Sequence, residues 1–227
     1  MIRVFAAPAG PGPLELSREE SRYLVRVRRA RVGEAVEVLD GRGAVFDGRV
    51  LRTGPRRAVV EVVAGPRRPT DPGPRLHLAV AVPSAQATAE VLAAATALGV
   101  ASIRLLATER AQPHGPSHDR IDRILRATLR QCGRPAPPPV EGPCPLAEAL
   151  DGLPSPRFLA APGAPHPGRW RAAEASLFVG PEGGFTDHER ALLEGAGCLP
   201  VGLGPHTLTT PLAVAAGLAG LRAAGPA

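Results

Sequence analysis

Three stretches rich in glycine and proline follow short apolar runs, and they are the first places where this sequence could hold a ligand. They are AAPG (residues 160–163), GPEGG (residues 180–184) and GLGP (residues 202–205). Glycine has no Cβ, so backbone N–H and C=O groups can approach a bound molecule closely. Taken alone, each stretch is typical of an ordinary connection after a strand. Together they favour a pocket for adenine or a nucleoside, built largely from backbone.

The middle stretch continues into a predicted helix. In LFVGPEGGFTDHE (residues 177–189), Thr186 is a good N-cap, and Glu189 three residues later completes a capping box. The spacing G-x-x-G-G matches neither the dinucleotide fingerprint nor the phosphate-binding loop with its Gly-Lys-Ser/Thr ending. Glu182 is the single carboxylate inside this turn.

The charge of the chain indicates an acidic partner, with one reservation. The formal net charge is +6, and all 27 basic residues are Arg. Such a balance favours nucleic acid, but the absence of Lys is equally typical of a genome-wide compositional bias. Arg22, Arg26 and Arg29 share one face of a predicted helix, capped by Ser17 and Glu20. This face is either a phosphate-contacting stripe or a solvated surface.

Metal and membrane chemistry find no support in the sequence. The three cysteines show no C-x-x-C spacing, which excludes a zinc site and a disulfide framework. Pro116 lies between His114 and His118 and spoils a shared helical face, so no metal site is expected there. Without an apolar run near the ~20 residues that span a bilayer, we expect a cytoplasmic protein.

The elements that must position these loops fall into two predicted domains. A small β-rich unit covers residues 1–71, with alternating strands in EAVEVLD, AVFDGRVLR and RAVVEVVAG. The Pro- and Gly-rich stretch of residues 65–75 resembles a linker, with the boundary near Asp71. Residues 72–227 then alternate strands with helices, which predicts a mostly parallel α/β sheet.

Five blocks of the sequence, in order, resemble the RsmE family of 16S ribosomal RNA uridine-N3 methyltransferases, within the SPOUT class. They are RYLVRVRRARVGEAVEVLDGRG, TALGVASIRLLATER, RQCGRPAPPPV, LFVGPEGGFTDHE and VGLGPHTLTTPLA. The run GPEGGF is the most specific of them. Since the blocks extend along most of the chain, the resemblance covers both predicted domains.

The resemblance implies a fold, a cofactor and a partner. The fold is a small PUA-like β-barrel that binds RNA, followed by a SPOUT-type knotted α/β methyltransferase domain with a trefoil knot. The enzyme is a homodimer that takes part in rRNA processing on the small ribosomal subunit. Its cofactor is S-adenosyl-L-methionine, and the implied contacts are Leu159, Ala160, Gly180, Pro181, Glu182, Gly183, Leu203, Gly204 and Leu208.

The sequence departs from the family pattern in its last loop. The family has L-G-x-R-I-L-R-T-E-T-A where this chain has LGPHTLTTPLA, so two family Arg positions fall on His206 and Thr209, and the Glu falls on Pro211. Thr210 with Pro211 still predicts a cap and first turn for the last helix.

These replacements affect the expected chemistry more than the fold. Uridine N3 must lose a proton, and the resulting anion needs positive charge or hydrogen-bond donors nearby. Arg110 and Arg134 are the best remaining cations. His206 is either the base, since imidazole titrates near neutral pH, or a surface histidine.

The sequence therefore predicts a methyltransferase that uses S-adenosylmethionine to modify N3 of a uridine in small-subunit ribosomal RNA. The alternative, which the altered loop supports, is a weakened or inactive SPOUT-fold RNA-binding protein.

Overall fold

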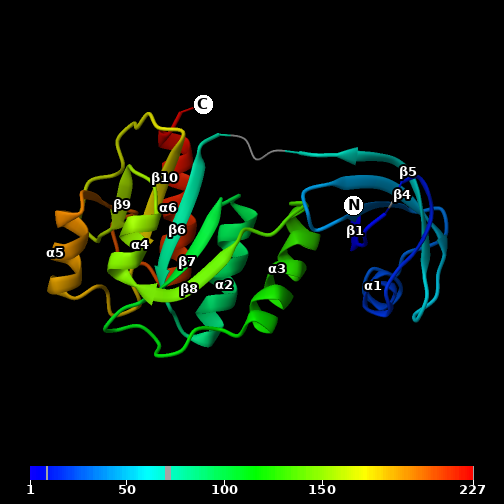
Figure 1. Cartoon of the computed structure of the whole chain (residues 1–227), viewed down its shortest axis with the longest axis horizontal. Coiled ribbons are helices and arrows are strands. Elements are labelled where there is room, and N and C mark those ends of the chain that lie inside the picture. Colours follow the sequence, from blue (N-terminus) through cyan, green and yellow to red (C-terminus); the bar gives the residue numbers. More distant parts are fainter. Residues whose placement is uncertain (9, 70–72, 227) are drawn as a thin grey trace. The chain divides into compact units, whose positions relative to one another are not determined.

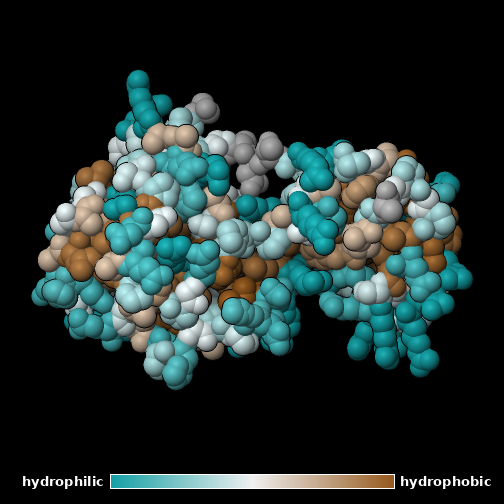
Figure 2. Space-filling model, in the orientation of Figure 1, coloured by the Kyte–Doolittle hydropathy of each residue, from teal (hydrophilic) through white to brown (hydrophobic). Residues whose placement is uncertain are grey.

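The computed structural model describes residues 1–8, 10–69 and 73–226, which fall into two compact units (Figure 1 and Figure 2). The first unit combines residues 1–71 with residues 126–137, and the second combines residues 72–125 with residues 138–227. The boundary predicted near Asp71 lies outside the described residues. The sequence assigned residues 126–137 to the second domain, but the structure groups them with the first unit.

The first unit is built on a five-stranded sheet with the order β1-β3-β4-β5-β2, in which β1 pairs parallel to β3 and the other neighbours are antiparallel. The strands are β1 Ile2–Phe5, β2 Gly12–Glu15, β3 Ala35–Leu39, β4 Val45–Arg52 and β5 Val59–Arg67. Alternate residues point into the core, among them Val36 and Val38 of β3. The three strands predicted from alternation are confirmed; the four-residue strands β1 and β2 were missed.

The predicted helix around the three arginines is shorter than expected. It consists of α1 (Arg18–Arg22) and one π-helical turn, η1 (Tyr23–Val27), and Arg29 follows with a φ of 53° outside it. Ser17 caps α1 by accepting a bond from the Glu20 N–H at 3.2 Å. Glu20 does not complete the capping box, because its carboxylate accepts the Phe5 N–H at 3.0 Å instead.

The second unit is a six-stranded, wholly parallel sheet with the order β11-β9-β10-β6-β7-β8. The strands are β6 Arg75–Ala81, β7 Ser102–Ala107, β8 Val140–Pro145, β9 Arg157–Ala160, β10 Glu174–Val179 and β11 Cys198–Val201. This confirms the predicted parallel α/β sheet. Strand β8 was missed because it contains two prolines, which are tolerated since it lies at the edge of the sheet.

Helices cover both faces of this sheet (Figure 1). They are α2 Ala85–Ala97, α3 His118–Cys132, α4 Leu146–Gly152, α5 Asp187–Gly195 and α6 Thr210–Ala224. Leu177 of β10 shares a core with Leu92 of α2 and Leu218 of α6, whereas its neighbour Phe178 packs with residues of α4 and α5. Strand β10 is thus buried on both faces, as its apolar run requires.

Helix α6 lies close to the sheet because of Gly217. A Cβ there would lie 2.6 Å from a side-chain carbon of Leu177. The small residues of α6 therefore serve packing inside this chain, at least on the face that meets β10.

A buried ion pair holds the last turns of α3 within the first unit. The Arg130 guanidinium bonds the carboxylates of Glu20 and, at 3.0 Å, Glu19, and it lies 4.7 Å from the ring centre of Tyr23. Only 12% of the Arg130 side chain and 4% of the Glu20 side chain are exposed. Burial disfavours the charged guanidinium, but the bonds to Glu20 and Glu19 outweigh it and raise the pKa of Arg130.

Replacing Arg130 by Met should lower the free energy of unfolding by about 3 kcal/mol or more, because the buried Glu20 carboxylate loses its cation. Urea denaturation measures this. The matched control is Arg126→Met, one turn earlier, where an exposed guanidinium lies 5.9 Å from the Phe5 ring centre. The control should cost under ~1 kcal/mol. Equal, small losses in both variants would refute the role of the pair.

Candidate functional site

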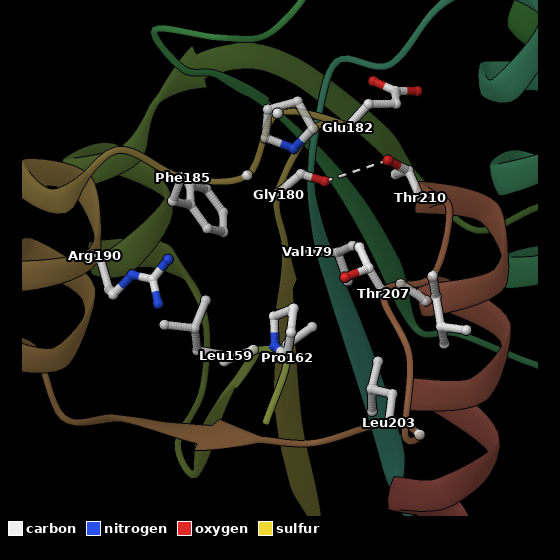
Figure 3. Close-up of a pocket in the computed structure, with 18 of the residues that line it drawn as sticks. Leu159, Pro162, Val179, Gly180, Glu182, Phe185, Arg190, Leu203, Thr207 and Thr210 are labelled. Atoms are coloured by element: carbon white, nitrogen blue, oxygen red, sulfur yellow. Dashed lines mark hydrogen bonds between the residues drawn. The ribbon is translucent and has the colours of Figure 1, made fainter. Parts of the chain in front are cut away.

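The carboxyl ends of β9, β10 and β11 meet at one edge of the sheet, because the three strands are parallel neighbours. The loops that follow them, residues 161–165, 180–185 and 202–208, surround a cavity of about 280 Å³ (Figure 3). The remaining walls come from the first turns of α5 and α6, through Arg190, Thr210 and Ala213. The three glycine-rich stretches singled out in the sequence are thus brought together.

Glycine is required at several points of these loops. Gly184 has a φ of +69° and donates its N–H to the carbonyl of Pro181 at 2.8 Å, which closes the turn after β10. A Cβ at Gly202 would lie 1.9 Å from the carbonyl oxygen of Ala164, and the Gly202 N–H bonds the Pro165 carbonyl at 2.7 Å. The chain after β11 therefore passes in direct backbone contact with the loop after β9.

The start of α5 is held as the sequence predicted. Thr186 caps the helix, and Glu189 completes the capping box by accepting the Thr186 N–H at 2.9 Å. The second carboxylate oxygen of Glu189 accepts the backbone N–H of Glu109 at 2.8 Å, and the residue is only 7% exposed. One buried carboxylate thus joins the loop after β7 to the first turn of α5.

The last helix begins one residue earlier than predicted. Its N-cap position is Thr209, whose side chain makes no capping bond, and Thr210 is already helical. The hydroxyl of Thr210 instead donates to the Gly180 carbonyl at 3.4 Å (Figure 3). This weak bond joins the first turn of α6 to the loop after β10. Two adjacent threonines are equally good caps by type, so the sequence could not distinguish them.

All nine residues predicted to contact the cofactor line the cavity. They are Leu159, Ala160, Gly180, Pro181, Glu182, Gly183, Leu203, Gly204 and Leu208. His206 also lines it, with an exposed side chain. Sequence reasoning missed other lining residues, among them Phe185, Arg190 and Ala213. Arg190 directly follows the capping box, and this position next to a predicted loop was the signal that could have identified it.

The predicted cations lie in different places. Arg110 is exposed, and its Nη1 donates to the carbonyl of Gly183 at 2.8 Å, so it braces the loop after β10 from outside the cavity lining. Arg134 belongs to the segment that groups with the first unit and is not among the lining residues. Arg22, Arg26 and Arg29 are exposed in the first unit, the first two on helical turns and the last beyond them.

The described lining of the cavity contains no cysteine and no cluster of metal ligands. Burial raises the pKa of the Cys198 thiol to about 11, so it stays protonated at neutral pH and is a poor nucleophile. Within residues 1–8, 10–69 and 73–226, three or more His, Cys, Asp or Glu side chains nowhere gather as metal ligands would. Within the same ranges, every helix is too short or too polar to cross a bilayer.

Comparison with known proteins decides the family. An RNA methyltransferase domain model matches residues 71–222, and an RNA methyltransferase PUA domain model matches residues 16–63. The chain is 30% identical, over 222 residues, to the ribosomal RNA small subunit methyltransferase E of Synechocystis sp., covering 92% of this chain and 72% of that protein. The chain belongs to the ribosomal RNA small subunit methyltransferase E family. The resemblance drawn from the five sequence blocks is thereby confirmed.

Two solved structures of similar proteins carry a cofactor. A methyltransferase from Legionella pneumophila, in complex with bound S-adenosylmethionine, is 29% identical, with a TM-score of 0.84 over 99% of this chain and 98% of that one. The family member from Neisseria gonorrhoeae, bound to S-adenosylmethionine, is 26% identical, with a TM-score of 0.83 over 98% and 97% of the chains. The predicted fold class, a PUA-like unit followed by a SPOUT-type α/β domain, is confirmed.

Replacing Gly183 by Val should abolish ligand binding in the cavity while leaving the fold intact. The backbone at Gly183 tolerates a side chain, and its Cβ would meet only the flexible side chain of Arg110, at 3.3 Å. The two further methyl groups crowd the loop that must approach a ligand. Calorimetry with S-adenosylhomocysteine measures the loss, and circular dichroism checks the fold. Gly168→Val, at an exposed glycine outside the cavity lining, is the control. Equal affinity in both variants would remove the loop from the site.

Proposed function

We propose that this chain is an S-adenosylmethionine-dependent methyltransferase that modifies N3 of a uridine in 16S, small-subunit ribosomal RNA. The observation that carries the proposal is the cavity at the carboxyl ends of β9, β10 and β11, lined by all nine residues predicted for the cofactor. Membership of the ribosomal RNA small subunit methyltransferase E family supports the substrate class.

The residues of the cavity suit this cofactor. Its walls combine the apolar side chains of Leu159, Leu203 and Leu208 with the exposed backbone of the glycine loops. Such a surface fits a flat, neutral adenine with several edge atoms to satisfy, as small-molecule pockets generally do. When bound, S-adenosylmethionine supplies an electrophilic methyl group on a sulfonium.

The chain's own task is to orient the uracil ring and remove a proton. A bond from the methyl carbon to N3 forms while the carbon–sulfur bond breaks, and the N3 proton leaves to a base. We assign His206 as that base, because among the described residues it is the only imidazole lining the cavity. Arg110, fixed by its bond to the Gly183 carbonyl, is assigned to stabilise the uracil anion. For Arg134 the same role rests on the family resemblance alone.

RNA contact is assigned to the first unit together with the methyltransferase domain. Arg22, Arg26 and Arg29 are exposed, and none of them forms an ion pair in the described part of the chain. A phosphate backbone offers them the opposite charge.

The proposal includes a trefoil knot, a homodimer and a cytoplasmic location. Support for the knot is the backbone contact between Gly202 and Ala164, where two loops of the cavity cross. Support for the dimer is the outer face of α6, where Leu212 is 57% exposed and Ala219 and Ala223 are exposed as well. The second candidate function, an inactive RNA-binding protein, is favoured by His206 and Thr209 in the altered loop.

The test is methyl transfer to small ribosomal subunits from cells that lack this gene. Purified enzyme with S-adenosylmethionine should produce one 3-methyluridine, which nucleoside analysis detects. Cofactor binding without any methylated nucleoside would favour the binding-only function.

In the same assay, His206→Arg with Thr209→Arg probes the altered loop. One preorganised donor at a developing anion typically contributes about 2.7–4 kcal/mol. Thr209→Arg alone keeps the assigned base and should therefore speed single-turnover transfer, whereas the double variant also loses His206 and should be slow. Thr209 makes no capping bond, so the helix start tolerates the change. A double variant as fast as Thr209→Arg alone would overturn the assignment of His206 as the base.

Changing Arg22, Arg26 and Arg29 to Gln should weaken RNA binding and flatten its salt dependence. Each arginine that neutralises a phosphate releases about one counterion, so the slope of log K against log salt should fall by about 2–3 in the triple variant. Fluorescence anisotropy with a small-subunit RNA fragment at several salt concentrations measures the slope. The control is Arg169→Gln, an exposed arginine of the second unit. An unchanged slope in the triple variant would make the three arginines a solvated surface.

A further inference from the structure

Among the described residues, the cavity lining includes one permanent cation that neither the sequence patterns nor the proposed mechanism uses. Arg190 lines the cavity from α5, and Figure 3 shows its guanidinium extending toward the cavity between Phe185 and Leu159. Its backbone position is set by the capping box: the Arg190 N–H bonds the Thr186 carbonyl at 2.8 Å, directly after the anchored Glu189. The Arg190 side chain thus starts from a backbone position that is held in place at the cavity wall.

Arg190 is also unpaired within the described part of the chain. The ten ion pairs found there involve other residues, and no hydrogen bond from the Arg190 guanidinium is present. The one carboxylate in the described lining belongs to Glu182, and it points away from Arg190 and from the cavity (Figure 3). The guanidinium therefore has its donors free for a ligand.

The charged groups in the cavity lining indicate which part of the cofactor Arg190 would bind. Apart from Arg190, Glu182 and His206, the described lining is apolar side chains, two threonines and backbone. Adenine and ribose are neutral, whereas the amino-acid end of S-adenosylmethionine carries one carboxylate, its only negative charge. A planar guanidinium matches a carboxylate with two parallel hydrogen bonds.

We propose that Arg190 binds the carboxylate of the cofactor's amino-acid end and so determines which way the cofactor lies in the cavity. This inference rests on the proposed function and deepens it. The rest of the cavity, bare backbone and apolar walls, then holds the nucleoside. Arg190 thereby distinguishes the full cofactor from nucleosides that lack the amino acid.

Comparing the binding of two nucleosides tests whether Arg190 binds the carboxylate or another part of the cofactor. S-Adenosylhomocysteine carries the carboxylate, and 5′-methylthioadenosine has the same adenosine and sulfur but no amino-acid end. Calorimetry should show that Arg190→Gln weakens S-adenosylhomocysteine binding by about 10- to 100-fold, the usual range for a hydrogen bond to a charged group. Binding of 5′-methylthioadenosine should change less than about twofold. Arg190→Lys, which keeps the charge but not the planar fork, should lie between.

The control variant is Arg171→Gln, an exposed arginine of the same unit outside the cavity lining, which should leave both affinities unchanged. Equal losses for both nucleosides in Arg190→Gln, or no loss for either, would overturn the inference and leave the cofactor site standing. Unchanged nucleoside binding with weaker binding of a small-subunit RNA fragment would overturn it in favour of a phosphate contact. Failure of the wild-type chain to bind either nucleoside would overturn the proposed function itself, and this inference with it.

Discussion

The close passage of two backbone segments at Gly202 is the constraint on which the cavity depends. The Gly202 N–H bonds the Pro165 carbonyl at 2.7 Å, and one residue earlier the Val201 carbonyl accepts the Ala161 N–H at 3.0 Å. With no room for a Cβ between Gly202 and Ala164, the loops after β9 and β11 are held against each other. Their outer surfaces, Pro162 on one loop and Leu203 on the other, then become two walls of one cavity. A side chain at residue 202 would separate these walls.

The buried carboxylate of Glu189 determines where two arginines, Arg110 and Arg190, lie beside the loops of the cavity. Its buried carboxylate accepts two backbone N–H groups, from Thr186 and Glu109, which lie far apart in the sequence. Arg110 follows one of these residues and braces Gly183, while Arg190 follows Glu189 itself and reaches the cavity. The positions of both arginines therefore depend on one carboxylate. Buried charges of this kind persist when hydrogen bonds satisfy them, as they do here.

The sequence predicted those features of the fold that depend on residues close together in the chain. The alternation of strands and helices, the three glycine loops and the capping box at Thr186 were all recovered, because each depends on residues within a few positions. The misses depend on distant partners. Glu20 does not form the predicted capping box, because its carboxylate accepts hydrogen bonds from the Phe5 N–H and from the Arg130 guanidinium. Arg130 lies 110 positions away in the sequence. Arg190 was missed because its position directly after the capping box does not by itself show which side of α5 faces the cavity.

Relative to the pattern of the sequence resemblance, the chain keeps the glycines and lacks several charges, and the two kinds of residue have different structural constraints. In this chain a Cβ at Gly202 would collide with fixed backbone atoms of Ala164, so the backbone contact requires glycine there. A charge acts over several ångströms, and a long side chain can deliver it from more than one element. Around this cavity, cations come from the loop after β7 through Arg110 and from α5 through Arg190. The last loop, with His206 and Thr209, is therefore free to change its charges while its backbone course stays the same.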